Sequence, residues 1–380
     1  MDQHLNEEYA AAALLERHQL PPEEKQALRK SMRARFLSIL LGIVFLGMLG
    51  ITVYAEYLLS MVNYVEPDAT APTLTQEQID AFHKETEAID VEFTGPEERE
   101  EDVILETAPQ MEVQSEEIVN ILLIGVDTRK NEPARSDSMI LCTLNKHTNT
   151  ITLTSFMRDM YVKIPGYKNN RINASFFFGG MQLLNKTLNQ NFGVVTDGIV
   201  EIDFANFEKL IDMLGGIELD INRTEANFIT QKTGKRIQTG VQVLNGEQAL
   251  WYSRCRSDSR GDFNRTNRQR IVLSTLLNEY KNQSLPALIG MMDDVLPMVT
   301  TNMTKDEILD HVTNFFPMLA TAEIVTQRIP EEGAYRQTRI NDMSVLVPDI
   351  SECIKVLQKT MEVPEPVEET VTEAFSGGVG

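Results

Sequence analysis

Hydrophobic and polar positions divide the chain into five successive parts. Residues 1–35 are polar and charged, and residues 36–59 are almost entirely apolar. Residues 60–117 are rich in proline, threonine and carboxylates, and residues 361–380 have the same character. Only residues 118–360 combine apolar runs with amphipathic stretches, which is the pattern of a folded domain. The pattern therefore predicts one domain between an acidic stalk and an acidic tail.

The apolar segment 36–59 carries no charge before Glu56 and is long enough for a transmembrane helix, which needs about 20 apolar residues. A cleaved signal peptide is the alternative, but the segment starts late and no small-residue cleavage site follows it. Four basic residues between Arg29 and Arg35 precede it. By the positive-inside rule, we expect a single-pass protein of the cell membrane with a cytoplasmic N-terminus and an extracellular domain.

The stalk and the tail contain few apolar residues. Residues 97–102 alone hold five acidic side chains. Such segments bury too little apolar surface to fold by themselves. Residues 60–117 are therefore expected to be extended, with one helical piece at 76–89, and residues 361–380 to be disordered.

Within residues 118–360, apolar runs typical of strands alternate with segments of helical spacing. The expected strands are 119–126, 138–144, 150–155, 160–164, 197–202, 217–221 and 323–329, and the expected helices are 180–191, 204–214, 268–280, 304–319 and 349–360. Strands that alternate with helices predict an α/β fold, here a three-layer α/β/α domain with a central mixed sheet.

Charge and cysteine content exclude several classes of function. The formal net charge is -21, which makes nucleic acid an unlikely partner because its binders present basic surfaces. The three cysteines lack the spacing of a disulfide framework or a zinc site. Cys255 is either a reactive thiol or, more simply, a small filler whose side chain faces away from the two arginines beside it. No GxSxG motif or Cys/His pair supports a hydrolase with a serine or cysteine nucleophile.

The stretch 249–269 concentrates arginine in an otherwise acidic chain. Arg254 and Arg256 are two residues apart, so an extended backbone would point both to one face. Arg265 and Gln269 then follow at helical spacing on what we expect to be a helix facing the same cavity. Guanidinium groups bind phosphate oxygens in pairs, and the stretch therefore predicts an anionic ligand. The alternative is a solvated loop paired with nearby carboxylates.

Carboxylates and further arginines stand at the ends of predicted strands. Asp127 ends the first strand, Arg135 and Asp137 precede the second, and Arg158 follows the third. Ligands collect at such strand ends in α/β sheets. Asp127 and Asp137 beside phosphate-binding arginines suit Mg²⁺, which typically uses one or two carboxylates and completes its shell with water and phosphate oxygens. The alternative is that the two aspartates pair with Arg129 and Arg135.

Taken together, these segments resemble the LytR-CpsA-Psr family of cell-wall ligases of Gram-positive bacteria. The matching pieces are NILLIGVDTR, RSDSMIL, SFMRDMYVKIPG, RINASFFFGG, LIDMLGGIELDI, LNGEQALWYSRCR and DFNRTNRQR. They cover residues 118 to about 275 in the family's order, whereas the resemblance is weak beyond about residue 285. Met157 is a departure, since the family usually has proline at this position.

The resemblance implies a phosphotransferase that moves a glycopolymer, such as wall teichoic acid or capsular polysaccharide, from undecaprenyl diphosphate to a muramic acid hydroxyl of peptidoglycan. Undecaprenyl phosphate would leave, and hydrolysis of the diphosphate would be a side reaction. By the family's pattern Asp127 and Asp137 hold Mg²⁺, and the diphosphate is bound by Arg135, Arg158, Arg254, Arg256, Arg265 and Gln269. Asp262 would be the general base for the attacking hydroxyl or would orient Arg265.

A polyprenyl tail requires an apolar slot. The candidates to line it are Phe176, Phe177, Phe178, Met181, Leu184, Leu188, Phe204, Phe207 and Met213. Plain core packing is the alternative for each of them.

A second hypothesis for the chain is a non-catalytic protein that binds polyprenyl phosphates or wall polymer and has a regulatory role. Some members of the family are named as transcriptional attenuators. An extracellular domain argues against direct contact with DNA. Turnover of a lipid diphosphate distinguishes the two hypotheses.

Overall fold

The computed structural model describes residues 52–66, 96–105, 115–127, 134–256, 261–281, 293–363 and a few positions outside these ranges. The chain separates into two units, Met1–Ser60 and Met61–Gly380. In the first unit, residues 52–59 form a helix. The basic flank, most of the predicted membrane span and all but residues 361–363 of the predicted disordered tail lie outside the described residues. Among the residues that are described, no helix is both long and apolar enough to cross a membrane.

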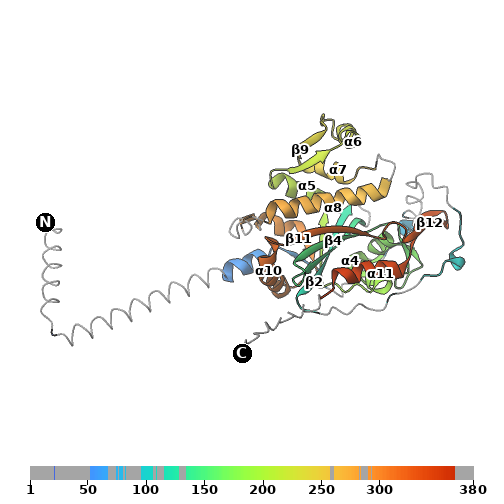
Figure 1. The fold of residues 1–380 in the computed structure, drawn as a ribbon, viewed down its shortest axis with the longest axis horizontal. Coiled ribbons are helices and arrows are strands. Elements are labelled where there is room, and N and C mark those ends of the chain that lie inside the picture. The colour runs from blue at the N-terminus through green and yellow to red at the C-terminus, as the bar shows by residue number, and fades with distance from the viewer. Residues whose placement is uncertain are drawn as a thin grey trace, which may run out of the picture. The chain divides into compact units, whose positions relative to one another are not determined.

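The second unit is built on a seven-stranded mixed sheet with the strand order β1-β10-β7-β2-β3-β4-β11 (Figure 1). Its centre is an antiparallel meander of β2 (Ile118–Asp127), β3 (Arg135–Asn145) and β4 (Thr150–Phe156). The outer strands are β7 (Gly198–Asp203), parallel to β2; β11 (Glu323–Ile329), parallel to β4; β10 (Val299–Thr301), antiparallel to β7; and β1 (Asn63–Tyr64), parallel to β10. The predicted α/β domain with a central mixed sheet is confirmed.

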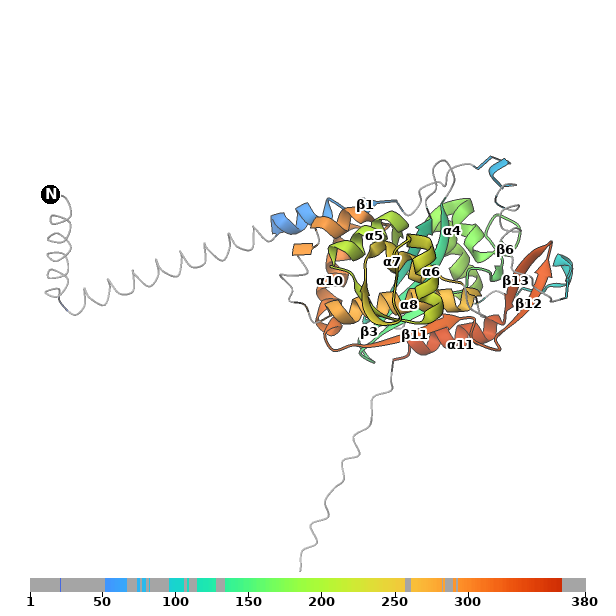
Figure 2. The ribbon, with the colours of Figure 1, turned by 90° about the horizontal axis from the view of Figure 1, so that it is seen from above.

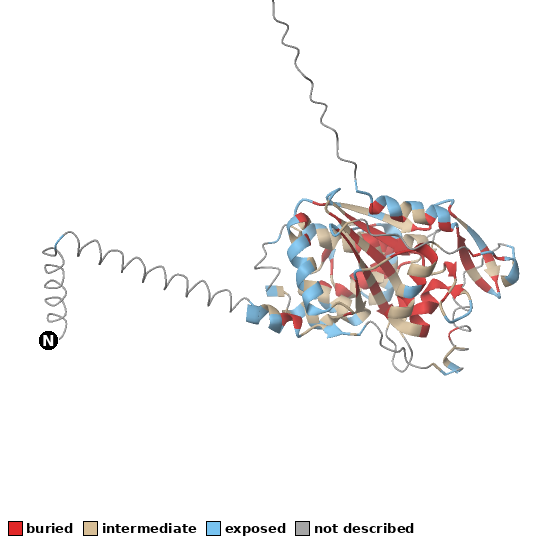
Figure 3. Ribbon diagram, turned by 90° about the horizontal axis from the view of Figure 1, so that it is seen from below, coloured by how far each residue is buried: buried red, intermediate tan, exposed pale blue. Residues whose placement is uncertain are grey.

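Helices cover both faces of this sheet, because side chains alternate along the buried strands. Leu122 and Ile124 of β2 pack in one core with α4 (Ile172–Phe192) and α11 (Ile350–Thr360). Val119 and Ile121 point to the other face, where they meet α8 (Gly261–Tyr280) and α10 (Lys305–Leu319). Figure 1 shows the sheet with α8 on one side and α4 and α11 on the other, and Figure 2 shows the same helices from above. Figure 3 shows that the central strands are buried.

A smaller layer lies beyond α8 (Figure 1). It comprises α5 (Phe204–Met213), the hairpin of β8 (Ile217–Ile221) and β9 (Gly240–Leu244), α6 (Arg223–Thr233) and α7 (Gly246–Ser253). These elements share a separate apolar core. Gly246 is required where α7 meets α5, because a Cβ there would lie 2.0 Å from the carbonyl oxygen of Glu208.

The extended backbone considered for the piece that carries Arg254 and Arg256 is not found at Arg254, which has φ -98° and ψ -1°. Asn245 and Gln248 form a capping box that starts α7, and the helix continues to Ser253 with Arg254 as its C-cap. The remaining elements are short or late in the chain: β5 (Tyr161–Val162), β6 (Asn170–Arg171), η1 (Glu100–Asp102), η2 (Leu296–Met298), β12 (Tyr335–Ile340) and β13 (Met343–Pro348).

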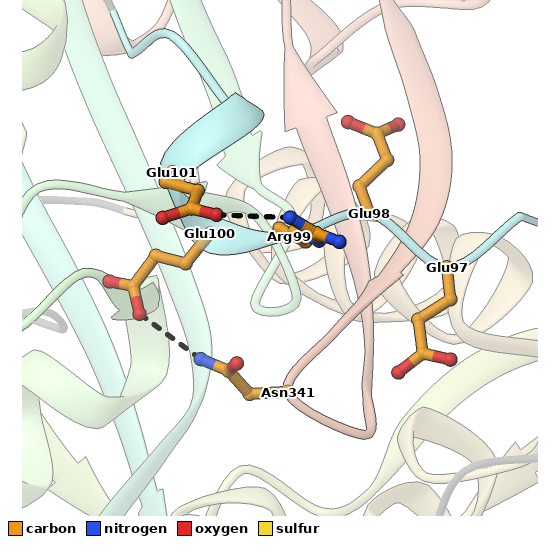
Figure 4. Close-up of a pocket in the computed structure, with 6 residues that line it drawn as sticks. All are labelled: Glu97, Glu98, Arg99, Glu100, Glu101 and Asn341. Atoms are coloured by element: carbon orange, nitrogen blue, oxygen red, sulfur yellow. Dashed lines mark hydrogen bonds and ion pairs between the residues drawn. The ribbon is translucent and has the colours of Figure 1, made fainter.

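The stalk prediction is wrong for the parts of residues 60–117 that pack on the domain. Glu98 lies along β12, where its amide donates to the carbonyl of Arg339 (2.8 Å) and its carboxylate accepts two hydrogen bonds from Arg336 (3.1 and 2.7 Å). The strands β12 and β13 form a hairpin, and Asn341 lies in its turn. Figure 4 shows the segment of Glu97, Glu98, Arg99, Glu100 and Glu101 beside this turn.

Isolated apolar side chains anchor this part of the chain. Val103 and Leu105 are buried with the β12–β13 hairpin. Phe82 is 1% exposed and stacks on Phe177 of α4, with ring centroids 4.4 Å apart. Single apolar residues in an acidic context produce no periodic pattern, which is why the sequence did not reveal them.

Candidate functional site

A cavity of about 330 Å³ opens at the ends of β2 and β3, beneath the smaller layer. Its walls are mostly charged or aromatic. The lining residues are Asp127, Arg135, Asp137, Arg158, Arg171, Asn173, Phe204, Phe228, Lys232, Trp251, Ser253, Arg254, Arg256, Arg265 and Gln269. All the predicted diphosphate-binding residues and both predicted metal ligands therefore meet in one place. We refer to it as the arginine cavity.

A β-bulge presents Asp137 to this cavity. Gly125 pairs with Ser138 and Val126 pairs with Ser136, so Asp137 is an extra residue of β3 that has no partner on β2. Such bulges redirect a side chain and release main-chain groups from the ladder. The carbonyl of Asp137 accepts a hydrogen bond from Gln269 Nε2 at 3.4 Å.

Arg158 and Asp262 form the centre of the charge cluster. Arg158 Nη1 donates to Asp137 Oδ1 at 2.9 Å, and its Nε lies 3.4 Å from Asp262 Oδ1. Arg265 Nη2 is 2.8 Å from the same Asp262 oxygen, and Arg256 Nε is 3.6 Å from it. Three guanidinium groups therefore surround one carboxylate.

Burial and neighbouring charges shift the pKa values of this cluster in different directions. Burial raises the pKa of Asp262 to about 6, although Arg158 and Arg256 oppose the shift. Burial alone would lower the pKa of Arg158, but the carboxylates of Asp159, Asp262 and Asp137 outweigh it and raise the pKa. Burial, followed by the charge of Arg158, lowers the pKa of Arg256. The pKa of Asp262 is thus raised toward neutral pH.

The helix α8 fixes the loop that carries Arg254 and Arg256. Arg268 forms a buried ion pair with Glu225 of α6 at 2.7 Å, and its Nη1 donates to the carbonyl of Cys255 at 2.9 Å. Cys255 is fully buried, which agrees with the hypothesis that it is a small filler. The two flanking arginines consequently project into the cavity although the preceding segment is helical.

Arg254 and Arg135 are held against aromatic rings. The guanidinium of Arg254 lies 4.8 Å from the ring centroid of Phe204 and 5.1 Å from that of Trp251, and its Nη2 is 3.6 Å from Asp127. Arg135 lies 5.1 Å from the ring centroid of Phe82. The contacts with the rings orient the two guanidinium groups.

A second cavity of about 250 Å³ adjoins the first and is almost entirely apolar. It lies between the sheet and the helices α5, α7 and α8. Both cavities include Phe204, Ser253 and Gln269 in their walls, so they meet there. Leu123, Ile140, Val200, Ile202, Phe207, Leu210, Leu250, Val272, Leu273 and Leu276 are among the other residues of this apolar slot.

The apolar slot corrects part of the lipid prediction. Phe204 and Phe207 line the slot as expected. Phe177, Met181 and Leu184 line neither cavity, because α4 buries them in the core on the opposite face of the sheet. Phe176, Phe178 and Leu188 belong to the same core.

Comparison with known proteins assigns the chain to a family. The model of the LytR_cpsA_psr family matches residues 81–362. The chain belongs to the LytR_cpsA_psr family. TagU of Bacillus cereus, named polyisoprenyl-teichoic acid–peptidoglycan teichoic acid transferase, is 31% identical over 306 residues, which are 80% of this chain and 90% of TagU. The resemblance deduced from the motifs is confirmed.

Two further similarities complete the comparison. The regulatory protein MsrR of Staphylococcus aureus is 29% identical over 235 residues, 60% of this chain and 69% of MsrR. A solved structure of TagT bound to LIIa-WTA has a TM-score of 0.54 and 25% identity, and the match covers 67% of this chain and 94% of that one.

The structure adds residues to the site of this LytR_cpsA_psr protein that the motifs did not single out. Arg171 lies 3.5 Å from Asp159, which is itself 3.5 Å from Arg158. Asn173 is 5% exposed, and its Oδ1 has no hydrogen-bond partner among the described residues. Both stand in the segment RINASFFFGG, where an arginine two residues before an asparagine was the available signal. Phe228, Lys232 and Trp251 gave no such signal.

The two predicted metal ligands of this family member are close to cations. Asp127 contacts Arg254, and Asp137 contacts Arg158 and Arg265. Across the described ranges, no group of three or more histidine, cysteine or acidic side chains is arranged to hold a metal. Two carboxylates that line one cavity fit an ion that takes its other ligands from phosphate and water.

Proposed function

We propose that this protein is a membrane-anchored phosphotransferase that moves an anionic glycopolymer, of the wall teichoic acid or capsular polysaccharide type, from undecaprenyl diphosphate to a muramic acid hydroxyl of peptidoglycan. One observation carries this proposal. The arginine cavity and the apolar slot share Phe204, Ser253 and Gln269 in their walls. A molecule with a diphosphate attached to a hydrocarbon chain fits both.

The apolar slot supplies affinity for the lipid. Its walls are almost entirely hydrocarbon, apart from Ser138, Ser253 and Gln269. Burial of a CH₂ group contributes about 0.8 kcal/mol. Several methylene and methyl groups of the first isoprenes in the slot would therefore hold the carrier while the reaction proceeds.

The arginines bind the diphosphate and stabilise the charge that develops during transfer. The aspartates that now pair with them hold the guanidinium groups in position before the substrate arrives. A diphosphate oxygen can replace a carboxylate at Arg254 or Arg256, whose side chains are 32% and 35% exposed. Phosphoryl transfer depends chiefly on such positioning and charge neutralisation.

Asp127 and Asp137 are the residues that would hold Mg²⁺. The ion would neutralise part of the charge on the phosphate oxygens. The positions of the two carboxylates, at the end of β2 and at the bulge of β3, would place this charge opposite the arginines of α7 and α8.

Asp262 is the group that would accept the proton of the attacking hydroxyl. Its pKa of about 6 leaves it ionised at neutral pH, and it lies within the arginine cluster. The muramic oxygen would attack the phosphorus that bears the glycopolymer. The bond from that phosphorus to the bridging oxygen would break, and undecaprenyl phosphate would leave.

The relatives support this assignment at the level of their names. TagU is named as a teichoic acid transferase to peptidoglycan, and the TagT structure is described as bound to LIIa-WTA. MsrR is named a regulatory protein, which keeps a non-catalytic polymer-binding role as the second candidate. The apolar segment 36–59 would anchor the protein with its domain on the outer side.

The test is turnover by the full-length protein in detergent. The substrates are a polyprenyl diphosphate oligosaccharide, Mg²⁺ and peptidoglycan fragments. We expect release of polyprenyl monophosphate together with phosphate-linked glycan on the peptidoglycan. Arg336→Lys is a matched control for the arginine variants, because Arg336 pairs with Glu98 away from the cavity. Binding without release in the wild type would instead establish the regulatory candidate.

A further inference from the structure

One end of the arginine cavity is aromatic, and the proposed diphosphate chemistry does not use it. Trp251 of α7 and Phe228 of α6 line the cavity with ring centroids 6.2 Å apart in an edge-to-face arrangement. Lys232, one turn along α6 from Phe228, places its Nζ 5.2 Å from the centroid of Trp251 and 5.7 Å from that of Phe228. We call these three residues the aromatic rim.

The aromatic rim continues the path that starts in the apolar slot. Phe204 lines both cavities, and Arg254 lies between the rings of Phe204 and Trp251. A molecule whose lipid occupies the slot and whose diphosphate reaches Arg254 therefore has its next chemical group near Trp251. In a lipid-linked glycopolymer that group is the first sugar.

The chemistry of the rim suits a sugar better than a further lipid or a bare phosphate. The C–H groups of a pyranose form an apolar face that packs on an aromatic ring, and its hydroxyls accept hydrogen bonds from an ammonium group. Both rings are half-buried and Lys232 is exposed. Within the part of the chain that the structure describes, no carboxylate is paired with Lys232, so its Nζ can move from the rings to a sugar.

We propose that the aromatic rim binds the saccharide unit attached directly to the diphosphate of the donor. Phe228 and Trp251 pack on the ring, and Lys232 binds its hydroxyl or acidic substituents. This proposal rests on the function proposed above and assigns specificity for the first sugar to α6 and α7. The contact is made before transfer and remains on the glycopolymer side of the bond that breaks.

Trp251 is the single tryptophan of the chain, so its fluorescence reports on this rim directly. The full-length protein in detergent is titrated with farnesyl diphosphate and with farnesyl diphospho-N-acetylglucosamine. We expect both to bind. Only the sugar-bearing ligand should shield Trp251 from quenching by acrylamide beyond the effect of farnesyl diphosphate.

Two variants keep the reporter and alter the rim. In Phe228→Leu and Lys232→Met, the sugar-bearing ligand should bind about tenfold more weakly, whereas affinity for farnesyl diphosphate stays within about twofold. Lys209→Met is the matched control, since Lys209 is an exposed lysine of α5 that is not in the lining of either cavity. It should leave both affinities unchanged.

Equal shielding by the two ligands, or equal weakening of both in the rim variants, would overturn the proposal, because the rim would then serve only the diphosphate. If the wild-type protein bound neither ligand, the proposed function itself would fall and this inference with it. The two failures are therefore distinguishable in one set of titrations.

Discussion

Replacing Asp262 by asparagine tests the assignment of the proton acceptor. Asp262 Oδ1 lies 2.8 Å from Arg265 Nη2, 3.4 Å from Arg158 Nε and 3.6 Å from Arg256 Nε. Asparagine keeps the size and shape of the side chain. It removes the negative charge and the capacity to take a proton, so the change isolates chemistry from packing.

The usual contribution of a general base gives the size of the expected loss of rate, and the raised pKa of Asp262 gives its pH range. A positioned general base contributes about 10²–10⁴-fold to the rate, so Asp262→Asn should lower kcat at pH 7.5 by about 10²-fold or more, or about 2.7 kcal/mol. Burial raises the pKa of Asp262 to about 6. Below that pH the carboxylate takes up a proton, and kcat/KM of the wild type should fall about tenfold per pH unit.

The assay is release of polyprenyl monophosphate between pH 5 and pH 9, with farnesyl diphosphate binding measured in parallel. We expect Asp262→Asn to lose the acidic limb and to bind the diphosphate at least as tightly, since one negative charge has been removed from the cluster with Arg158, Arg256 and Arg265. A limb near pH 6 that persists in the variant would refute the base assignment. Weaker diphosphate binding with little change in kcat would show that Asp262 only orients Arg265.

Stability gives an independent check on the same pKa. A carboxyl whose pKa is higher in the folded state than in the unfolded chain stabilises the fold at low pH. This contribution is lost as pH rises from about 4 to about 6. The melting temperature of Asp262→Asn relative to the wild type should therefore increase across this window. A difference that is constant with pH would contradict the raised pKa.

Three further predictions follow from the site and the sequence. Asp127→Asn and Asp137→Asn should each weaken the activation by Mg²⁺ without unfolding the domain, and an unchanged Mg²⁺ titration in both would contradict the metal assignment. Arg254→Lys and Arg256→Lys keep the charge but lose the fork, so each should reduce turnover by about tenfold, or about 1.4 kcal/mol. The double variant should lose less than the product of the two losses because both act on one diphosphate, and full activity in both single variants would refute the clamp. Protease added to wall-stripped cells should digest a C-terminal tag and spare an N-terminal one, and the reverse result would invert the topology.

Local sequence signals predicted most of the sheet and its helices. The continuous apolar run of β2 and the capping box of Thr304 and Glu307 specify their elements within a few residues, and both are confirmed. In the smaller layer the predicted α5 and β8 are confirmed, whereas α6, β9 and α7 were not predicted; α6 is polar over most of its surface. The anchoring of Phe82 was missed because its partner Phe177 is distant in sequence.

The sequence predicted which residues form the site but not how the fold brings them together. The spacing of Arg254 and Arg256 correctly predicted that both side chains enter one cavity. They do so because α7 ends at this point and Arg268 binds the carbonyl of Cys255, not because the segment is an extended strand. Of the residues predicted to line the lipid slot, only Phe204 and Phe207 do so, since aromatic content alone does not show which face of the sheet a helix covers. The bulge at Asp137 depends on the register of two strands, which no local pattern specifies.

The strand order also bears on how the domain forms during synthesis. β2, β3 and β4 are consecutive in the chain and adjacent in the sheet, so this meander can assemble early. β11, which covers the free edge of β4, begins only at Glu323, and α11 begins at Ile350. A nascent chain that ends at Tyr280 already contains every residue of the arginine cavity. It nevertheless lacks β10 and β11, so it exposes both edges of its sheet as well as the apolar flank of α4. We therefore expect it to aggregate rather than to bind lipid. We therefore expect the chain to bind its lipid carrier only after the last 60 or so residues have been synthesised.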